Sequence, residues 1–268
     1  MDVETGLADV GGGRLYYEVA GSGSPLVLIH GFTLDRRMWD DQFEHFADRY
    51  RVVRYDQRGF GRSDVPAEAP YSNHGDLRRL LDHLGIDGAH VCGLSSGGGV
   101  AIDLALEHPD YVRSMVGISS ALGGSDRGIG SMTDAVVAMN AAAVRGDLDE
   151  AKRIWLTSSL FAPARRDPAV AARLIEIVGD WSGWHLTNQA DHTDPEPAAA
   201  QRLDRLGIPM LLVTGELDNE AIQLVSRDIE EGAPDARLVV VPDAGHLANM
   251  EAPDVVNDQI GAFLAGVG

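Results

Sequence analysis

The chain has 268 residues, of which 44% are hydrophobic, and its formal net charge at pH 7 is −19. This length suits one domain with an insertion, and the hydrophobic content is that of a globular protein with a large core. The acidic balance argues against nucleic acid or an anionic membrane surface as a partner, because both require a basic face on the protein. Composition leaves open whether copies of the chain form a homo-oligomer.

No targeting or membrane signal is visible. The first ten residues are acidic and lack the basic and apolar regions of a secretory signal. No apolar run reaches the roughly 18 residues of a membrane span. Cys92 is the only cysteine, so no intrachain disulfide can form, and its apolar surroundings predict a buried strand residue. We therefore expect a cytoplasmic protein.

Short apolar runs alternate with helical patterns along most of the chain. The start predicts an antiparallel edge hairpin between residues 5–10 and 13–20. Six further runs predict strands that are covered on both faces: 25–30, 51–56, 90–94, 112–118, 210–214 and 237–241. Between them lie four predicted helices: 73–84, 97–107, 221–230 and 253–264. This alternation predicts an α/β fold with a mostly parallel central sheet and helices on both faces.

Residues 123–201 break the alternation. This segment is rich in alanine, helical in pattern and without a good strand, and it holds Trp155, Trp181 and Trp184. A helical insertion between two strands explains this pattern. We therefore expect a core domain of residues 1–122 and 202–268 and a helical insertion of residues 123–201, with a polar loop at 191–197.

Gly93-Leu94-Ser95-Ser96-Gly97 matches the pattern G-x-S-x-G around Ser95 only, because centring on Ser96 would put Leu94 where glycine is needed. The glycines allow the serine to sit on a sharp strand-to-helix turn, where larger side chains would collide. The helix N-terminus places backbone N–H groups and a positive dipole end beside a developing oxyanion. Ser95 is the predicted nucleophile, and a plain turn residue is the alternative.

A serine nucleophile needs a base and an acid that orients the base. His246 follows the last strand run and Asp218 follows the run at 210–214, so both are expected at the carboxyl edge of the sheet. Catalytic sites of parallel sheets lie at that edge. His246 is therefore the predicted base and Asp218 the predicted acid, with three neighbouring carboxylates as alternatives for the acid: Glu216, Glu220 and Asp243.

Five segments together resemble the α/β-hydrolase fold family over nearly the whole chain. They are His30-Gly31-Phe32, Asp-Gln-Arg-Gly-Phe-Gly-Arg-Ser at 56–63, residues 93–98, 215–218 and 245–246. The order of serine, acid and histidine is also that of the family. Within the family, these motifs most resemble those of the enol-lactonase and small carboxylesterase branch. The resemblance implies that the backbone N–H groups of Phe32 and Ser96 form the oxyanion hole, and that the insertion is a cap over the site.

These features predict a serine hydrolase that cleaves a carboxylic ester or lactone, a small-molecule substrate, through an acyl-enzyme on Ser95. The same triad leaves open C–C bond hydrolysis, thioester hydrolysis and perhydrolysis, and a ligand-binding receptor or accessory protein on this scaffold is a further alternative. Related dehalogenases and epoxide hydrolases carry Asp at the nucleophile position, so Ser95 argues against both. No H-E-x-x-H, Cys/His cluster or G-x-G-x-x-G occurs, so we expect no metal and no cofactor.

Other residues near these motifs have two interpretations. The tryptophans are candidates for the substrate pocket, with the core or a helix face as the alternative: Trp39, Trp155, Trp181 and Trp184. His30 is expected to brace the oxyanion loop. We expect Arg58 and Arg62 to brace their loop rather than to bind a substrate carboxylate.

Overall fold

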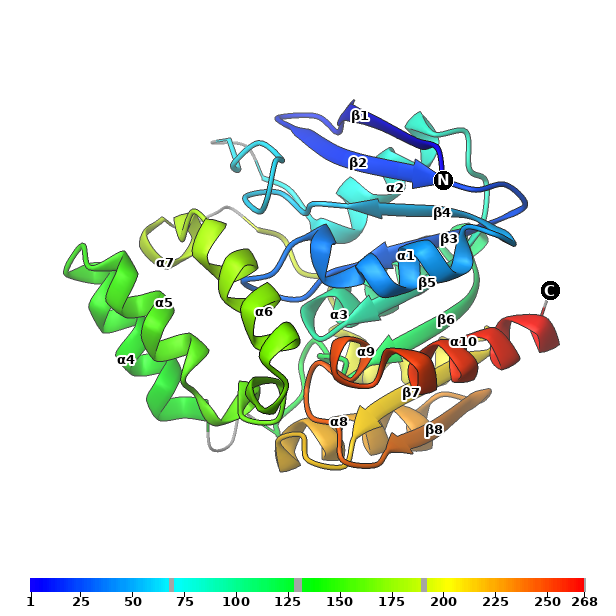
Figure 1. The fold of residues 1–268 in the computed structure, drawn as a ribbon. Coiled ribbons are helices and arrows are strands. Elements are labelled where there is room, and N and C mark those ends of the chain that lie inside the picture. Colours follow the sequence, from blue (N-terminus) through cyan, green and yellow to red (C-terminus); the bar gives the residue numbers. More distant parts are fainter. Residues whose placement is uncertain (68–69, 128–131, 189–191, 268) are drawn as a thin grey trace.

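The computed structural model describes residues 1–67, 70–127, 132–188 and 192–267 (Figure 1). Its centre is a sheet with the strand order β1-β2-β4-β3-β5-β6-β7-β8. The strands are β1 (Val3–Asp9), β2 (Arg14–Ala20), β3 (Ser24–Ile29), β4 (Tyr50–Tyr55), β5 (Ala89–Leu94), β6 (Val112–Ile118), β7 (Met210–Gly215) and β8 (Ala236–Val241). The pairings of β1 with β2 and of β2 with β4 are antiparallel, and all others are parallel. The predicted hairpin and mostly parallel sheet are confirmed.

Helices cover both faces of the sheet (Figure 1). One face carries α2 (Asn73–His83), α3 (Ser96–Glu107) and α8 (Glu220–Gly232). The other carries α1 (Asp40–Phe46), α9 (Ala248–Glu251) and α10 (Pro253–Val267). In the described residues no helix is both long and apolar enough to span a membrane.

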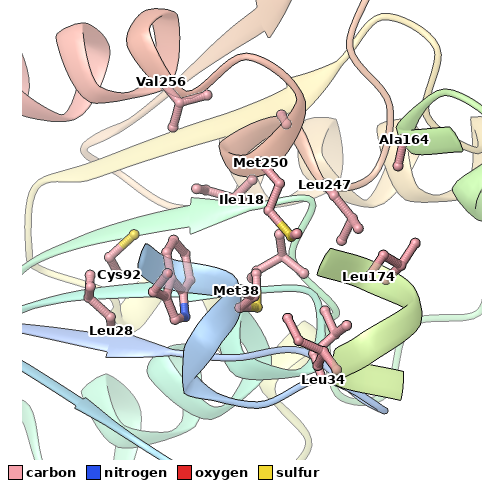
Figure 2. Packing of buried hydrophobic residues seen from close by; sticks show 14 of the residues in the cluster. Leu28, Leu34, Met38, Cys92, Ile118, Ala164, Leu174, Leu247, Met250 and Val256 are labelled. Carbon is pink, nitrogen blue, oxygen red and sulfur yellow. The ribbon is translucent and has the colours of Figure 1, made fainter. Parts of the chain in front are cut away.

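Two hydrophobic clusters fill the space between the sheet and these helices. Side chains alternate across a strand, so Leu26 and Leu28 of β3 join one cluster while Val27 and Ile29 join the other. Figure 2 shows part of the first cluster, which contains Leu28 beside residues of several other segments. The central strands are therefore covered on both faces, as their continuous apolar runs predict.

The last strand differs from this expectation. We expected the run 237–241 to be buried on both faces, but the burial of β8 is only partial and Val240 is 47% exposed. The reason is its place at the edge of the sheet, where β8 pairs with β7 alone.

A helical segment lies between β6 and β7, at one side of the sheet (Figure 1). Its helices are α4 (Thr133–Val144), α5 (Leu148–Leu156), α6 (Pro168–Asp180) and α7 (Trp184–Thr187). Further 3₁₀ turns occur along the chain at Arg36–Trp39, Pro109–Tyr111, Ser159–Phe161, Ala164–Arg166, Ala199–Gln201 and Leu203–Arg205.

The sequence explains where these helices begin. Asp147 caps α5 by accepting from the N–H of Glu150, and Asp167 caps α6 ahead of Pro168, which needs no N–H acceptor in the first turn. The described residues of 123–201 form no strand, apart from one bridge between His192 and Tyr71. Asp191, the first residue of the predicted polar loop, lies outside the described residues.

Candidate active site

Ser95 sits at the turn between β5 and α3, with a φ of 54° and a ψ of −119°. Its N–H donates to the carbonyl of Ile118 at 2.9 Å, and its carbonyl accepts from the N–H groups of Gly98 and Ala121, each at 2.9 Å. Non-glycine residues rarely adopt this backbone conformation, and it persists only where the surroundings hold it. The end of β6 supplies that support and keeps Ser95 on a strained turn.

The glycines on either side of Ser95 are required by close backbone contacts. A Cβ atom on Gly93 would overlap the backbone of Gly97. A Cβ atom on Gly97 would overlap the backbone of Ile29 on β3. The physical reason given for the G-x-S-x-G pattern is therefore confirmed.

His246 and Asp218 meet where the loops after β8 and β7 come together. His246 Nδ1 lies 3.2 Å from each carboxylate oxygen of Asp218, and the two residues are only 4% and 8% exposed. Asp218 Oδ1 also accepts from the N–H of Asn219 at 2.7 Å. A Cβ atom on Gly215 would overlap the backbone of the His246 loop, so glycine allows the two loops to approach.

The other carboxylates that the sequence left open lie elsewhere. Glu216, Glu220 and Asp243 are exposed, and Glu216 accepts from the N–H of Asp243 at 3.2 Å. Asp218 is therefore the one of the four candidates that the structure brings onto the imidazole of His246.

Ser95 and His246 line a common cavity of about 100 Å³, together with Phe32. The rest of its wall is apolar and comes from both the sheet region and the helical segment: Leu34, Leu94, Met132, Trp155, Leu160, Phe161 and Ile222. A larger surface hollow of about 640 Å³ lies between residues 122–127 and 200–232, but it contains neither Ser95 nor His246. Of these two hollows, only the smaller one is lined by the predicted nucleophile and base.

A family model described as alpha/beta hydrolase fold matches residues 24–253 of the chain. The chain belongs to the α/β-hydrolase fold family. A putative carbamate hydrolase of Azorhizobium caulinodans is 29% identical over 269 residues, covering 94% of this chain and 96% of the relative. The acetyltransferase component of an acetoin cleaving system of Pseudomonas putida is 33% identical, covering 96% of this chain and 68% of the relative.

Solved structures agree with this assignment. An esterase from Rhodococcus superposes with a TM-score of 0.84 at 25% identity, covering all of both chains. The enol-lactonase from Burkholderia xenovorans superposes with a TM-score of 0.79 at 26% identity, covering 97% of this chain and 100% of the other. This α/β hydrolase is therefore an enzyme, and the resemblance to esterases and an enol-lactonase is confirmed.

The α/β hydrolase uses its tryptophans in different ways. Trp155 lines the cavity, and its indole N–H donates to Thr33 Oγ1 at 2.8 Å. Trp181 is 3% exposed and packs edge-to-face on Phe32 at 5.4 Å between ring centroids, but it does not reach the cavity wall. Trp184 is half-buried against its neighbour His185 and also lies outside the wall.

The pocket interpretation of Trp39 is wrong. The side chain is fully buried in the first hydrophobic cluster and is absent from the cavity wall. The 3₁₀ turn Arg36–Trp39, capped by Asp35 through the N–H of Arg37, directs the indole into the core instead. The place of Trp39 in the sequence, shortly after Phe32, could not reveal the direction of its side chain.

The bracing roles expected for His30 and Arg58 are confirmed. His30 Nε2 accepts from the N–H of Gln57 at 2.9 Å, and burial lowers the pKa of the imidazole, so it is neutral and able to accept. Arg58 donates to both oxygens of the buried Asp76, at 2.7 and 2.8 Å. The Arg62 guanidinium lies over the Tyr16 ring, 4.1 Å from its centroid.

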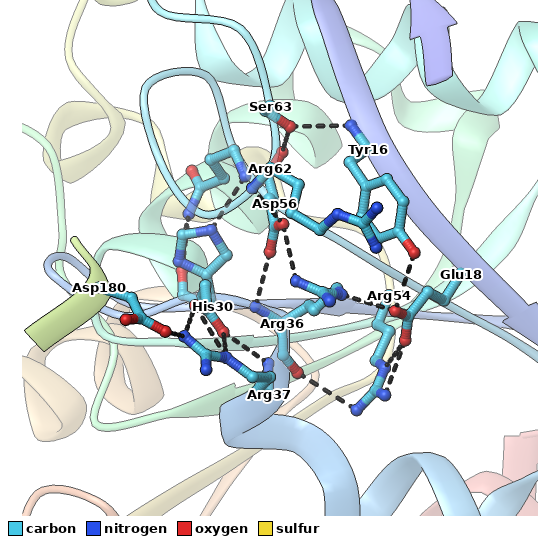
Figure 3. A network of polar contacts seen from close by, with 12 residues as sticks. Tyr16, Glu18, His30, Arg36, Arg37, Arg54, Asp56, Arg62, Ser63 and Asp180 are labelled. Carbon is cyan, nitrogen blue, oxygen red and sulfur yellow. Dashed lines mark hydrogen bonds and ion pairs between the residues drawn. The ribbon is translucent and has the colours of Figure 1, made fainter. Parts of the chain in front are cut away.

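A buried ionic network next to the loop after β3 was not predicted (Figure 3). Arg36 donates to Glu18 at 2.7 Å and to Asp56 at 3.0 Å, and Arg54 pairs with both Glu18 and Asp40. Burial opposes ionisation of Glu18, but its hydrogen bonds and charge pairs with the two arginines outweigh burial and lower its pKa. The sequence signal that could have indicated this network was the presence of the charged residues Glu18 and Arg54 inside predicted strands. The network ties the loop after β3 to β2 and β4.

Proposed function

We propose that this α/β hydrolase cleaves a carboxylic ester or lactone through an acyl-enzyme on Ser95. One observation carries the proposal. Ser95, on its strained turn, and His246, held by the buried Asp218, line the same apolar cavity. That is the arrangement in which a serine hydroxyl is activated by a neighbouring base.

Each residue then has a definite task. His246 takes the proton of Ser95 as the hydroxyl attacks the carbonyl carbon, and Asp218 orients the imidazole and stabilises its cation. Ser96 is the first residue of α3, so its N–H has no intrahelical acceptor and can hold the oxyanion together with the N–H of Phe32. His246 returns the proton to the leaving group, and a water activated by His246 releases the acid.

The helical segment acts in this proposal as a cap over the site. Its support is that Trp155, Leu160 and Phe161 form part of the cavity wall beside Ser95. The names of the relatives, which include an esterase, an enol-lactonase and a putative carbamate hydrolase, favour acyl transfer to water. A cytoplasmic location stays a prediction of the sequence.

A pair of adjacent serines provides the test. Ser95→Ala should lower turnover of a p-nitrophenyl ester by about 10⁶-fold, because the nucleophile is lost. Ser96→Ala keeps the backbone N–H and should stay within roughly tenfold of the wild type. A fluorophosphonate probe should label the wild type and Ser96→Ala but spare Ser95→Ala. Full activity in Ser95→Ala, or an adduct on Ser96, would show that the proposed function is wrong.

A further inference from the structure

The cavity beside Ser95 is small for a substrate site. It measures about 100 Å³, whereas small-molecule pockets commonly measure roughly 300–1,000 Å³. A cavity of roughly 150 Å³ accepts benzene, which has six carbon atoms. By that measure this cavity holds about four non-hydrogen atoms. Only one end of an ordinary ester therefore fits inside it.

Apart from Ser95 and His246, the side chains of the cavity wall offer this end of the substrate apolar contacts. Leu34, Leu94 and Leu160 contribute aliphatic side chains. The indole N–H of Trp155 is already bonded to Thr33, so it is not free to bind a polar substrate atom. Among the described residues of the wall there is no Asp, Glu, Lys or Arg. A charged group would lose its hydration here without gaining a partner.

We propose that this cavity holds the acyl half of the substrate, and that the enzyme prefers esters of uncharged acids with about two to four carbon atoms. This inference rests on the proposed function. Gly31 and Phe32, from the oxyanion loop, and Leu94, which directly precedes Ser95, belong to the wall, so the cavity begins where the acyl carbon is bound. The leaving group takes its proton from His246 and departs, so it points away from the enclosed end.

Two ester series test the assignment. In p-nitrophenyl esters of increasing acyl length, kcat/KM should be greatest at about two to four carbons and then fall by about tenfold per added methylene. In acetate esters of increasing alcohol length, kcat/KM should change little. A maximum at about eight carbons or more, or dependence on the alcohol alone, would overturn the proposal. If the acyl-length proposal failed in this way but Ser95→Ala were inactive on every ester, the proposed function would still hold.

Variants of the wall sharpen the test. Leu160→Ala in the helical segment and Ile222→Ala on α8 remove side-chain carbons from the wall and should each move the preferred acyl length upward by about two carbons. Leu186→Ala is the matched control, because Leu186 is half-buried in the same helical segment but outside the wall. An unchanged preference in the folded wall variants, or an equal shift in the control, contradicts the proposal. Because Ile222 lies on α8, outside the helical segment, Ile222→Ala still tests the proposal if Leu160→Ala does not fold.

An independent observation concerns the loop that carries His246. Glu251, the last residue of α9, accepts from the N–H of Gly245 at 2.7 Å and from the N–H of Leu247 at 3.0 Å. These two N–H groups flank His246 on either side. On the helical-segment side, Pro163 packs so closely that a Cβ atom on Gly245 would lie 2.6 Å from its Cγ.

We infer that Glu251 is a positioning residue for His246, again on the basis of the proposed function. Asp218 orients the imidazole through Nδ1, whereas Glu251 holds the main chain from which the imidazole projects. A displacement of about 1 Å in a catalytic group can lower the rate by about 10²-fold.

Glu251→Gln keeps the size of the side chain but replaces one acceptor oxygen by a donor. We expect kcat to fall by about 10- to 100-fold at unchanged KM, with slower fluorophosphonate labelling of Ser95. Glu150→Gln is the control, because Glu150 pairs with Arg153 at the surface. An unchanged kcat, or a change in KM alone, would overturn the inference, and Glu251→Asp is judged by the same criteria if Glu251→Gln does not fold. Failure to label Ser95 in the wild type would instead contradict the proposed function.

Discussion

The sheet edge and the helical segment contribute to the cavity in different ways. Ser95, Asp218 and His246 each follow a strand, and backbone hydrogen bonds and close glycine contacts hold their loops. Trp155 and Leu160 come from the helical segment and reach the cavity through their side chains. The main chain of the sheet thus places the three proposed catalytic residues, while residues of the segment line the space beside them. Changes in the two regions should therefore have different consequences.

The two regions are nevertheless packed together. Ala164 and Leu174 of the helical segment lie in the first hydrophobic cluster beside Leu247 (Figure 2). The His185 ring of α7 stacks on Phe60, 4.4 Å between centroids, in the loop after β4. Burial lowers the pKa of His185 to about 4, so the stacked ring is uncharged at neutral pH.

The largest effect is expected at the sheet edge. Asp218→Asn should lower kcat by up to about 10⁴-fold with the fold intact, because the amide favours the wrong tautomer of His246. Steady-state kinetics and a melting curve measure the two quantities. Glu216→Gln, two residues earlier and exposed, should stay near the wild type. If Glu216→Gln were the inactive variant, the assignment of the acid would be wrong.

Removing an ion pair should destabilise the protein more on the sheet side than in the helical segment. Arg58→Ala leaves the buried Asp76 with only the longer contact to the exposed Arg79, at 3.7 Å, and should lower the free energy of unfolding by about 3 kcal/mol. Arg153→Ala removes an exposed pair with Glu150 on α5 and should leave the free energy of unfolding nearly unchanged, because water screens exposed charges. Urea unfolding of the two variants measures the difference. Equal losses would contradict the view that the sheet side carries the costly ionic contacts.

A smaller effect is expected where the regions meet. Trp155→Phe keeps an aromatic wall but leaves the buried Thr33 hydroxyl without its donor, at a cost of about 1–3 kcal/mol. Thr33 has a φ of 66° and follows Phe32, so we expect kcat to fall by about tenfold. Trp184→Phe, whose indole lies outside the wall, should change neither quantity. A loss of stability with unchanged kcat would confine Trp155 to a structural role.

The smallest effect tests a carboxyl group of α3 that faces the helical segment. Burial, and then the charge of Asp194, raise the pKa of Asp103 to about 7. Below about pH 4 the group is protonated in both the folded and the unfolded chain, and above about pH 7 it is charged in both, at a cost to the folded state. Asp103→Asn should therefore gain about 1 kcal/mol of stability at pH 8 and nothing at pH 4. Melting temperatures of Asp103→Asn and the wild type at the two pH values measure this difference. A gain in stability at pH 4 alone would contradict the prediction.

The same two regions differ in how far the sequence predicts them. β6 spans Val112–Ile118 as expected, and the other predicted strands and helices differ by a few residues at their ends. Apolar runs that stop at Gly, Pro or Asp are local signals, so they survive in any packing. α1 (Asp40–Phe46) was not predicted, because its seven residues make fewer than two helical turns and show too little of the helical periodicity.

Local sequence was sufficient to favour Ser95 over Ser96 as the predicted nucleophile, because the pattern requires glycines at fixed distances from the serine along the chain. It favoured Asp218 over three other carboxylates without excluding them, and it could not single out Trp155 among four tryptophans. Those choices depend on the direction of side chains from segments far apart in the sequence. Only the packing of the whole chain decides that direction, and it buries Trp39 in the core while bringing Trp155 to the cavity.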